Sequence, residues 1–167
     1  MRYNQDSMAV LPIVTGENNP ILRTKTRKAG GITEEVKTLI ADMRDTLAQA
    51  KGLGLAAPQV GSNLRVCLVT LDEKTFPLIN PEIIKRSART TVDEEGCLSL
   101  PKLWLPVARA VEITIQYMDE KGKVKERTLE GFDARVVQHE LDHLDGVLIV
   151  DYQVKNLLVV QNRAQKN

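Results

Sequence analysis

The stretch Gln138-His139-Glu140-Leu141-Asp142-His143, QHELDH, contains both histidines of a chain of 167 residues. Around it, over residues 133–144, apolar side chains recur at helical spacing, and Gly146 is a natural stop signal. Residues four positions apart lie on one face of a helix, so both imidazoles can direct a nitrogen at the same point. The stretch therefore predicts a metal-binding helix. Its expected core-facing stripe consists of Val136, Val137, Leu141 and Leu144.

Glu140 follows the first histidine and lies about 100° further round the helix. Its carboxylate is expected beside the metal as a general base for the bound water, and not among the ligands. A catalytic metal of this kind takes three protein ligands and keeps one open position. Cys97 is the best candidate for the third ligand, because EEGCLSLP predicts a glycine-bearing turn, whereas Cys67 lies in an apolar, strand-like run.

The remaining sequence predicts an α+β fold. Over residues 33–50 apolar side chains recur every three or four positions, which indicates a helix that Thr33 caps and Gly52 ends. The following GLGLAAPQVG favours an ordered loop. Strands are expected in LRVCLVTL, VEITIQYM and VKERTL, while FPLINPEII is extended but broken by prolines. We therefore expect antiparallel or mixed β-sheets packed around a central metal-binding HExxH helix, with an N-terminal helix.

Composition and charge restrict the classes of protein that fit. A length of 167 residues with 43% hydrophobic content predicts one domain over residues 1–167. The net charge of +1 excludes a global attraction to nucleic acid or to a membrane surface, and two cysteines are too few for a disulfide framework. The N-terminal residues lack the pattern of a secretory signal, so we expect a soluble, cytoplasmic protein. The tail at 154–167 is expected to form a final strand or a short helix.

Three motifs of the chain resemble the signature motifs of the peptide deformylase family, in the same order and with similar spacing. They are GLGLAAPQ at 52–59, EGCLS at 95–99 and QHELDH at 138–143. The similarity extends from NPILR near Asn19 to GVLIVDY near Tyr152. It implies a metal-dependent hydrolase that removes the N-formyl group from the N-terminal formyl-methionine of newly synthesised polypeptides and releases formate.

The resemblance also assigns roles to individual residues. The implied metal ligands are Cys97, His139 and His143. Glu140 is the implied general acid/base for the metal-bound water that attacks the formyl carbon. Gln59, through its side-chain amide, and Leu98, through its backbone N–H, match the positions that stabilise negative charge on the former carbonyl oxygen. These roles are consistent with general metal chemistry, because a divalent ion held by one thiolate and two imidazoles lowers the pKa of its bound water toward neutrality.

Other positions are expected to contact the substrate. Without a Cβ, Gly52 and Gly54 let the backbone approach the peptide and adopt torsions that other residues avoid. The residues that match the family's methionine pocket are Leu53, Phe132 and Val136, the last of which also belongs to the core stripe. Trp104 departs from the pattern, because some relatives carry a basic residue there. This departure leaves open how the substrate is held beyond its first residue.

Behind the site, Glu95 and Arg109 are expected from their family positions to form an ion pair that fixes the Cys97 loop, with plain surface charges as the alternative. The implied cofactor is one divalent metal ion per chain. The resemblance indicates Fe2+ as the physiological ion, with Zn2+, Ni2+ or Co2+ as alternatives, although the affinity order alone favours zinc over iron. The implied partners are nascent formyl-methionyl polypeptides. The resemblance also admits the ribosome, with no direct nucleic-acid function and no membrane.

Two other functions fit parts of the pattern. A generic HExxH metallopeptidase shares the helix, the histidines and the glutamate, but usually takes its third ligand downstream, where the chain offers Asp145 and Asp151. A non-catalytic structural zinc module would use Cys67 together with Cys97 and both histidines, and it leaves Glu140 without a purpose. Cleavage of internal peptide bonds would favour the metallopeptidase, and loss of metal binding in Cys67→Ser would favour the zinc module.

Overall fold

The computed structural model describes residues 9–153. The helices are α1 (Pro20–Arg23), α2 (Glu34–Ala50), the short 3-10 helix η1 (Ala57–Val60) and α3 (Gly131–Leu144). The strands are β1 (Gly54–Ala56), β2 (Val66–Leu71), β3 (Lys74–Arg86), β4 (Thr90–Cys97), β5 (Leu100–Ala110), β6 (Glu112–Met118) and β7 (Val124–Glu130). The tail at 154–167 lies outside the described residues, so the strand or helix expected there stays a prediction.

The strands form two sheets. The larger has the order β1-β2-β3-β6-β7, and the smaller is the hairpin β4–β5. Neighbouring strands in the described part of the chain all pair antiparallel, and the parallel contact between Arg27 and Leu64 is an isolated bridge. Of the antiparallel or mixed sheets expected from the sequence, the structure therefore has antiparallel ones, and the α+β class is confirmed.

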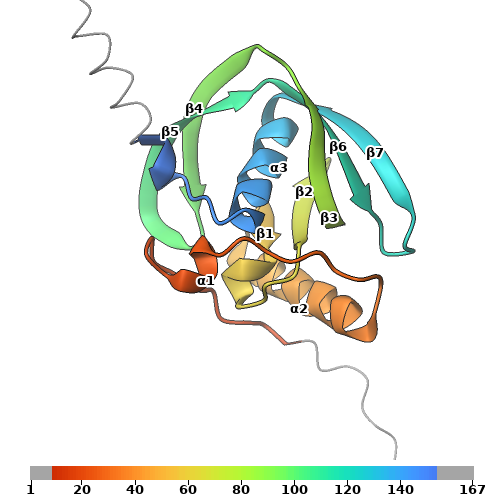
Figure 1. The fold of residues 1–167 in the computed structure, drawn as a ribbon. Coiled ribbons are helices and arrows are strands. Elements are labelled where there is room, and N and C mark those ends of the chain that lie inside the picture. Colours follow the sequence, from red (N-terminus) through yellow and green to blue (C-terminus); the bar gives the residue numbers. More distant parts are fainter. Residues whose placement is uncertain (1–8, 154–167) are drawn as a thin grey trace, which may run out of the picture.

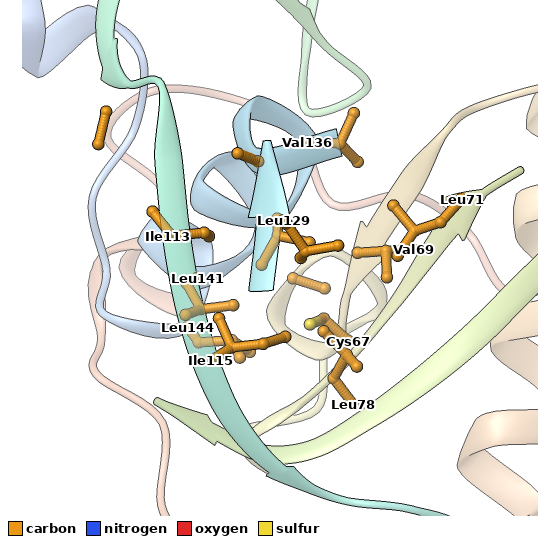
Figure 2. Close-up of a cluster of buried hydrophobic side chains, with 14 residues drawn as sticks. Cys67, Val69, Leu71, Leu78, Ile113, Ile115, Leu129, Val136, Leu141 and Leu144 are labelled. Carbon is orange, nitrogen blue, oxygen red and sulfur yellow. The ribbon is translucent and has the colours of Figure 1, made fainter. Parts of the chain in front are cut away.

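Helix α3 lies between the two sheets (Figure 1), where it contacts β1, β2 and β7 on one side and β5 on the other. The apolar stripe predicted for this helix is buried. Figure 2 shows Leu141 and Leu144 of α3 beside Ile113 and Ile115 of β6. Truncating a core leucine to alanine typically costs about 2–5 kcal/mol. This packing therefore holds the helix, and the two histidines with it, in a fixed position against the large sheet.

The ends of α2 follow local sequence rules only in part. Oγ1 of Thr33 accepts a hydrogen bond from the backbone N–H of Val36 at 3.3 Å, which confirms Thr33 as the N-cap. The helix ends at Ala50, before Gly52, as predicted, but Lys51 and not the glycine adopts the left-handed conformation, with φ of 53°. Gly52 comes next, and its N–H bonds back to the carbonyl of Leu47 at 3.3 Å. The segment expected as an ordered loop then forms β1 and η1.

Two further predictions are wrong because proline and glycine fit strands at particular positions. FPLINPEII is not broken, but lies within the single strand β3. Pro77 precedes the part of β3 that pairs with β6, and Pro81 lies at a bulge, the places where a strand tolerates proline. EEGCLSLP is mostly strand and not a turn, since Cys97 is the last residue of β4 and the turn itself comprises Leu98 and Ser99.

Candidate metal centre

Two separate elements bring the predicted metal ligands together. Helix α3 supplies His139 and His143, and the end of β4 supplies Cys97. One ligand atom from each of the three residues lies within 4.8 Å of the others, and Sγ of Cys97 is 3.2 Å from Nε2 of His143. Among residues 9–153, no other cluster of cysteine, histidine and carboxylate side chains converges in this way. One thiolate and two imidazoles so arranged fit a divalent transition metal ion.

The surroundings of each histidine direct one ring nitrogen at the cluster. Nδ1 of His139 is 2.9 Å from Oε2 of Glu95, which leaves Nε2 of the same ring for a metal. His143 is buried and points Nε2 at Cys97. Its Nδ1 atom has no hydrogen-bond partner within the described part of the chain. The ring orientations are therefore those that a chelate on one helical face requires.

Charge at the site is set by burial and by the neighbouring groups. Burial and the charge of His139 lower the pKa of His143 well below its usual value, so this ring is neutral, as a metal ligand must be. For His139, burial acts in the same direction, but hydrogen bonds to Cys97 and Glu95 outweigh it and raise the pKa to about 10. Without a metal ion the His139 ring would therefore carry a proton, which a bound ion would replace on Nε2.

Glu95 is the centre of a buried network behind the site. Its Oε1 accepts hydrogen bonds from Nε of Arg109 at 2.9 Å and from Nη1 of Arg135 at 2.7 Å, and its Oε2 accepts from Nη2 of Arg109 at 2.8 Å. The ion pair expected between Glu95 and Arg109 is present, and both side chains are buried. Burial opposes ionisation of Glu95, but hydrogen bonds from Arg109 and His139 outweigh it and lower its pKa to about 2.

Three members of this network were not among the predicted site residues, namely Arg135, Asp142 and Tyr152. Nη1 of Arg109 donates to the Asp142 carboxylate and, at 2.8 Å, to the Tyr152 hydroxyl, which itself donates to Asp142 at 2.7 Å. For Arg109, which was predicted, the sequence contains a signal of burial, because the alternation along β5 places it on the same face as Leu105 and Val107. Arg135 has no such signal, because it resembles any charged residue on an amphipathic helix.

Glu140 lies in the interior beside the ligands. Its side chain is buried, and its Oε2 atom has no hydrogen-bond partner among residues 9–153. Burial raises its pKa to about 7, although the nearby His139 acts in the opposite direction. A carboxyl group with a pKa near neutrality can both take and return a proton, which is the property of a general acid/base. A cation held by the three ligands would favour the ionised form.

Gly54 makes room for this carboxylate and Gly52 makes room for two leucine side chains, but neither for the torsional reason expected. Neither Gly52 nor Gly54 has a positive φ, so the prediction of unusual backbone torsions is wrong. The reason is space, since a Cβ on Gly54 would lie 2.6 Å from Cδ and 2.7 Å from Cγ of Glu140. A Cβ on Gly52 would lie 3.0 Å from the side chain of Leu47 and 3.2 Å from that of Leu98.

Gln59 presents an amide N–H₂ group to the same site. Its Oε1 accepts a hydrogen bond from the backbone N–H of Ala56 at 2.9 Å, which fixes the orientation of the amide. Nε2 then lies 3.1 Å from Oγ of Ser99 and 3.9 Å from Sγ of Cys97. Leu98 follows Cys97 directly and lies in the hairpin turn, so its backbone is also adjacent to the ligands. Both predicted oxyanion donors are thus beside the cluster.

A cavity of about 420 Å³ opens onto the ligands. Its walls include Leu53, Trp104, Phe132 and Val136, with Cys97, His139 and Glu140 at its base. Leu53 and Phe132 are 48% and 60% exposed, so the apolar rim faces solvent, whereas Val136 is 8% exposed and belongs to both the cavity wall and the core cluster. The cavity is therefore apolar at its wall and polar at its base, as expected for a site that binds an apolar side chain.

The residues needed for the two alternative sites lie elsewhere. Cys67 is fully buried in β2, among core side chains that include Leu78 (Figure 2), and does not join the ligand cluster. Asp145 pairs with Arg65 at 2.8 Å, and Asp151 pairs with Arg23 at 2.6 Å. The geometry therefore supports neither a four-ligand structural site nor a third ligand from the downstream aspartates.

Comparisons of the sequence and of the structure with known proteins all indicate the same family. The model of the polypeptide deformylase family matches residues 10–157. A peptide deformylase of Dictyoglomus thermophilum is 46% identical over 145 residues, which are 87% of this chain and 94% of that protein. The crystal structure of peptide deformylase from Thermotoga maritima is similar with a TM-score of 0.82 at 38% identity, covering 86% of this chain and 97% of that one. The Met-Ala-Ser-bound class I type b peptide deformylase from Acinetobacter baumannii has a TM-score of 0.84 at 31% identity, covering 87% and 99%. The chain belongs to the polypeptide deformylase family.

Proposed function

We propose a mechanism by which this chain performs the reaction of its family, the hydrolytic removal of the N-formyl group from nascent polypeptides. The observation that carries the proposal is the convergence of Cys97, His139 and His143 within 4.8 Å beside a buried glutamate and at the base of a cavity. These three side chains would hold one divalent metal ion. When bound, such an ion supplies Lewis acidity, lowering the pKa of water and polarising a carbonyl group.

Glu140 moves the protons in this mechanism. It takes a proton from the attacking water as the new bond to the formyl carbon forms, and returns it to the peptide nitrogen as the bond between carbon and nitrogen breaks. Burial raises the pKa of Glu140 and so helps it to hold a proton, while a bound cation would favour the ionised form that accepts the first proton. The products are formate and a peptide with a free N-terminal amine.

Gln59 and Leu98 stabilise the charge that develops on the formyl oxygen. Nε2 of Gln59 is aimed at the site because its other amide atom, Oε1, is held by the backbone N–H of Ala56. The backbone N–H of Leu98 provides the second donor. Donors that are already in place before the reaction stabilise the transition state without the cost of reorganising.

The apolar cavity receives the methionine side chain. Phe132 and Val136 of α3 and Leu53 of the segment before β1 supply its apolar wall. The related enzyme from Acinetobacter baumannii has been crystallised with Met-Ala-Ser bound, a peptide that begins with methionine. Gly52 and Gly54 flank Leu53 on one segment of the cavity wall, where the main chain of the substrate would lie.

The proposed ion is Fe2+, with Zn2+, Ni2+ or Co2+ able to occupy the same ligands, since cysteine and imidazole bind all four. The reaction takes place in the cytoplasm, close to the ribosome, where newly made chains carry formyl-methionine. No helix in the described part of the chain is long and apolar enough to cross a membrane.

The test is release of formate from formyl-Met-Ala-Ser by protein purified without oxygen, with acetyl-Met-Ala-Ser as the matched control. The expected result is formate from the first peptide, with the Met-Ala and Ala-Ser bonds left intact. Metal-loaded protein that released no formate would contradict the proposal. Cleavage of the internal bonds would favour the generic metallopeptidase instead.

A further inference from the structure

The third metal ligand lies on a hairpin that shares no strand pairing with the large sheet. Within residues 9–153, β4 pairs with β5 alone, whereas α3 packs its apolar stripe on the large sheet. Backbone hydrogen bonds between strands therefore do not fix the position of Cys97 relative to the two histidines. Within the described residues, one backbone hydrogen bond, from the N–H of Gly16 to the carbonyl of Ser99 at 3.0 Å, reaches the turn beside Cys97, and side-chain contacts between the hairpin and α3 connect it with the helix.

Arg135 makes the most extensive of these contacts. Nη1 of its guanidinium donates to Oε1 of Glu95 at 2.7 Å and to the carbonyl of Val107 at 2.8 Å, and Nη2 donates to the carbonyl of Thr91 at 2.8 Å. Glu95 and Thr91 belong to β4, and Val107 belongs to β5. One side chain from α3 thus holds both strands of the hairpin.

The guanidinium is well suited to this role. It is planar and permanently charged, and its fork of N–H donors can satisfy three acceptors in fixed directions, which a lysine ammonium cannot match. The side chain of Arg135 is buried, 5% exposed, so these hydrogen bonds are protected from water.

The position of Arg135 couples this clamp to the metal ligands. Arg135 precedes His139 by four residues and therefore lies on the same face of α3. Glu95, which precedes Cys97 by two residues on β4, accepts hydrogen bonds from both Arg135 and His139. The ligand from the helix and the ligand from the hairpin are thus connected through one carboxylate and one guanidinium.

We propose that Arg135 is a positioning residue for the metal centre: it clamps the hairpin β4–β5 to α3 and so keeps Cys97 within reach of the two histidines. This inference rests on the metal site proposed above. Loss of the clamp lets the end of β4 move away from the helix, so the thiolate is lost as a ligand before the histidines are. Metal affinity falls further than an equal loss of buried hydrogen bonds elsewhere would cause.

Arg65 provides a matched control. It is also buried, 7% exposed, and it also connects the end of α3 with a strand segment, donating to the carbonyls of Pro81 and Leu144 and to the carboxylate of Asp145. It does not contact Glu95 or the hairpin. Arg65→Met therefore removes a similar set of contacts without touching the proposed clamp.

The experiment is a Co2+ titration of the full chain without substrate, comparing wild type with Arg135→Met, Arg135→Lys and Arg65→Met. The readouts are the Co2+ dissociation constant, the thiolate-to-cobalt absorption band and the melting temperature. Because no peptide is present, contacts of Arg135 with a substrate do not enter. Arg135→Lys keeps the charge and one or two hydrogen bonds, and it tests the inference if the methionine variant does not fold.

The expected result is a Co2+ affinity lower by about 10- to 100-fold in Arg135→Met, a loss typical of residues that orient metal ligands, with a weakened thiolate band and partial recovery in Arg135→Lys. Arg65→Met is expected to lower the melting temperature but to keep the wild-type affinity and band. Equal affinities and bands in the Arg135 and Arg65 variants would overturn the inference and leave the proposed function intact. Wild-type protein that bound no Co2+ would instead overturn the metal site itself.

Discussion

Nδ1 of His139 lies 2.9 Å from Oε2 of Glu95, so a carboxylate orients the first of the two proposed histidine ligands. The contact fixes the tautomer of the ring and leaves Nε2 for the metal. The same carboxylate is held by Arg109 and lies two residues before Cys97. One acidic side chain therefore orients a ligand on the helix and anchors the strand that carries another.

Glu95→Gln tests the importance of this charge. The amide keeps the shape of the side chain but removes the negative charge that compensates Arg109 and Arg135. Changes in residues that hydrogen-bond to metal ligands typically weaken metal binding by about 10- to 100-fold. We expect faster metal loss to a chelator and a lower melting temperature. The control is Glu126→Gln on the exposed face of β7, which should change neither. Wild-type metal retention in Glu95→Gln would contradict the assigned role.

Gly54→Ala tests the room reserved for the general base. The added Cβ would lie 2.6 Å from Cδ of Glu140, so the carboxylate must move, and a misplacement of about 1 Å can cost about 100-fold in rate. We expect kcat to fall by about that factor while bound metal is retained. Gly30→Ala is the matched control, because its Cβ would meet nothing within 4 Å. Equal kcat values for the two variants would show that Gly54 has no such role.

Gln59→Met tests the oxyanion donor. The change removes Nε2 from the site and is expected to lower kcat by about 100- to 1,000-fold, the usual cost of losing such a donor. KM should change little, because the donor acts mainly on the transition state. The variant should also unfold more easily, since the buried N–H of Ala56 loses its acceptor. A raised KM with unchanged kcat would assign Gln59 to substrate binding instead.

Helix α3 could be predicted from the sequence because the signals that indicate it lie close together in the chain. The apolar stripe that includes Val137 and Leu144, and the histidines four residues apart, require only the helical repeat to be interpreted, and the structure places all of them as this repeat predicts. The cap at Thr33 is local in the same sense. The helix begins two residues earlier than expected, at Gly131, which is the usual uncertainty at a helix end.

The hairpin β4–β5 and the clamp behind the site could not be predicted in this way. Glycine and proline around Cys97 favour a turn by local rules, and the pairing partner of β4 becomes evident only in three dimensions. Arg135 is buried because Glu95 and two carbonyls surround it, and these acceptors are at least 28 residues away in sequence. A buried charge whose partners are all distant leaves no periodic signal.

If the metal ion is Fe2+, as proposed, the enzyme should lose activity in air. Oxidation of either the Fe2+ ion or the Cys97 thiolate would inactivate the site. Ni2+ is not readily oxidised in air. We expect deformylase activity of the Fe2+ form to decay on exposure to air and that of the Ni2+ form to persist. The measurement is residual activity and metal content over time for both forms in air and under nitrogen. Equal decay of both forms would count against iron chemistry at this site.

The central claim is that Glu140 moves the proton at a metal site formed by Cys97, His139 and His143. Its most direct test is formate release from a formyl-methionyl peptide by wild type and Glu140→Ala, with bound metal counted on the same samples. The account predicts about one metal ion per chain in both proteins, with turnover in the wild type and almost none in the variant. Near-normal turnover in metal-loaded Glu140→Ala would contradict it.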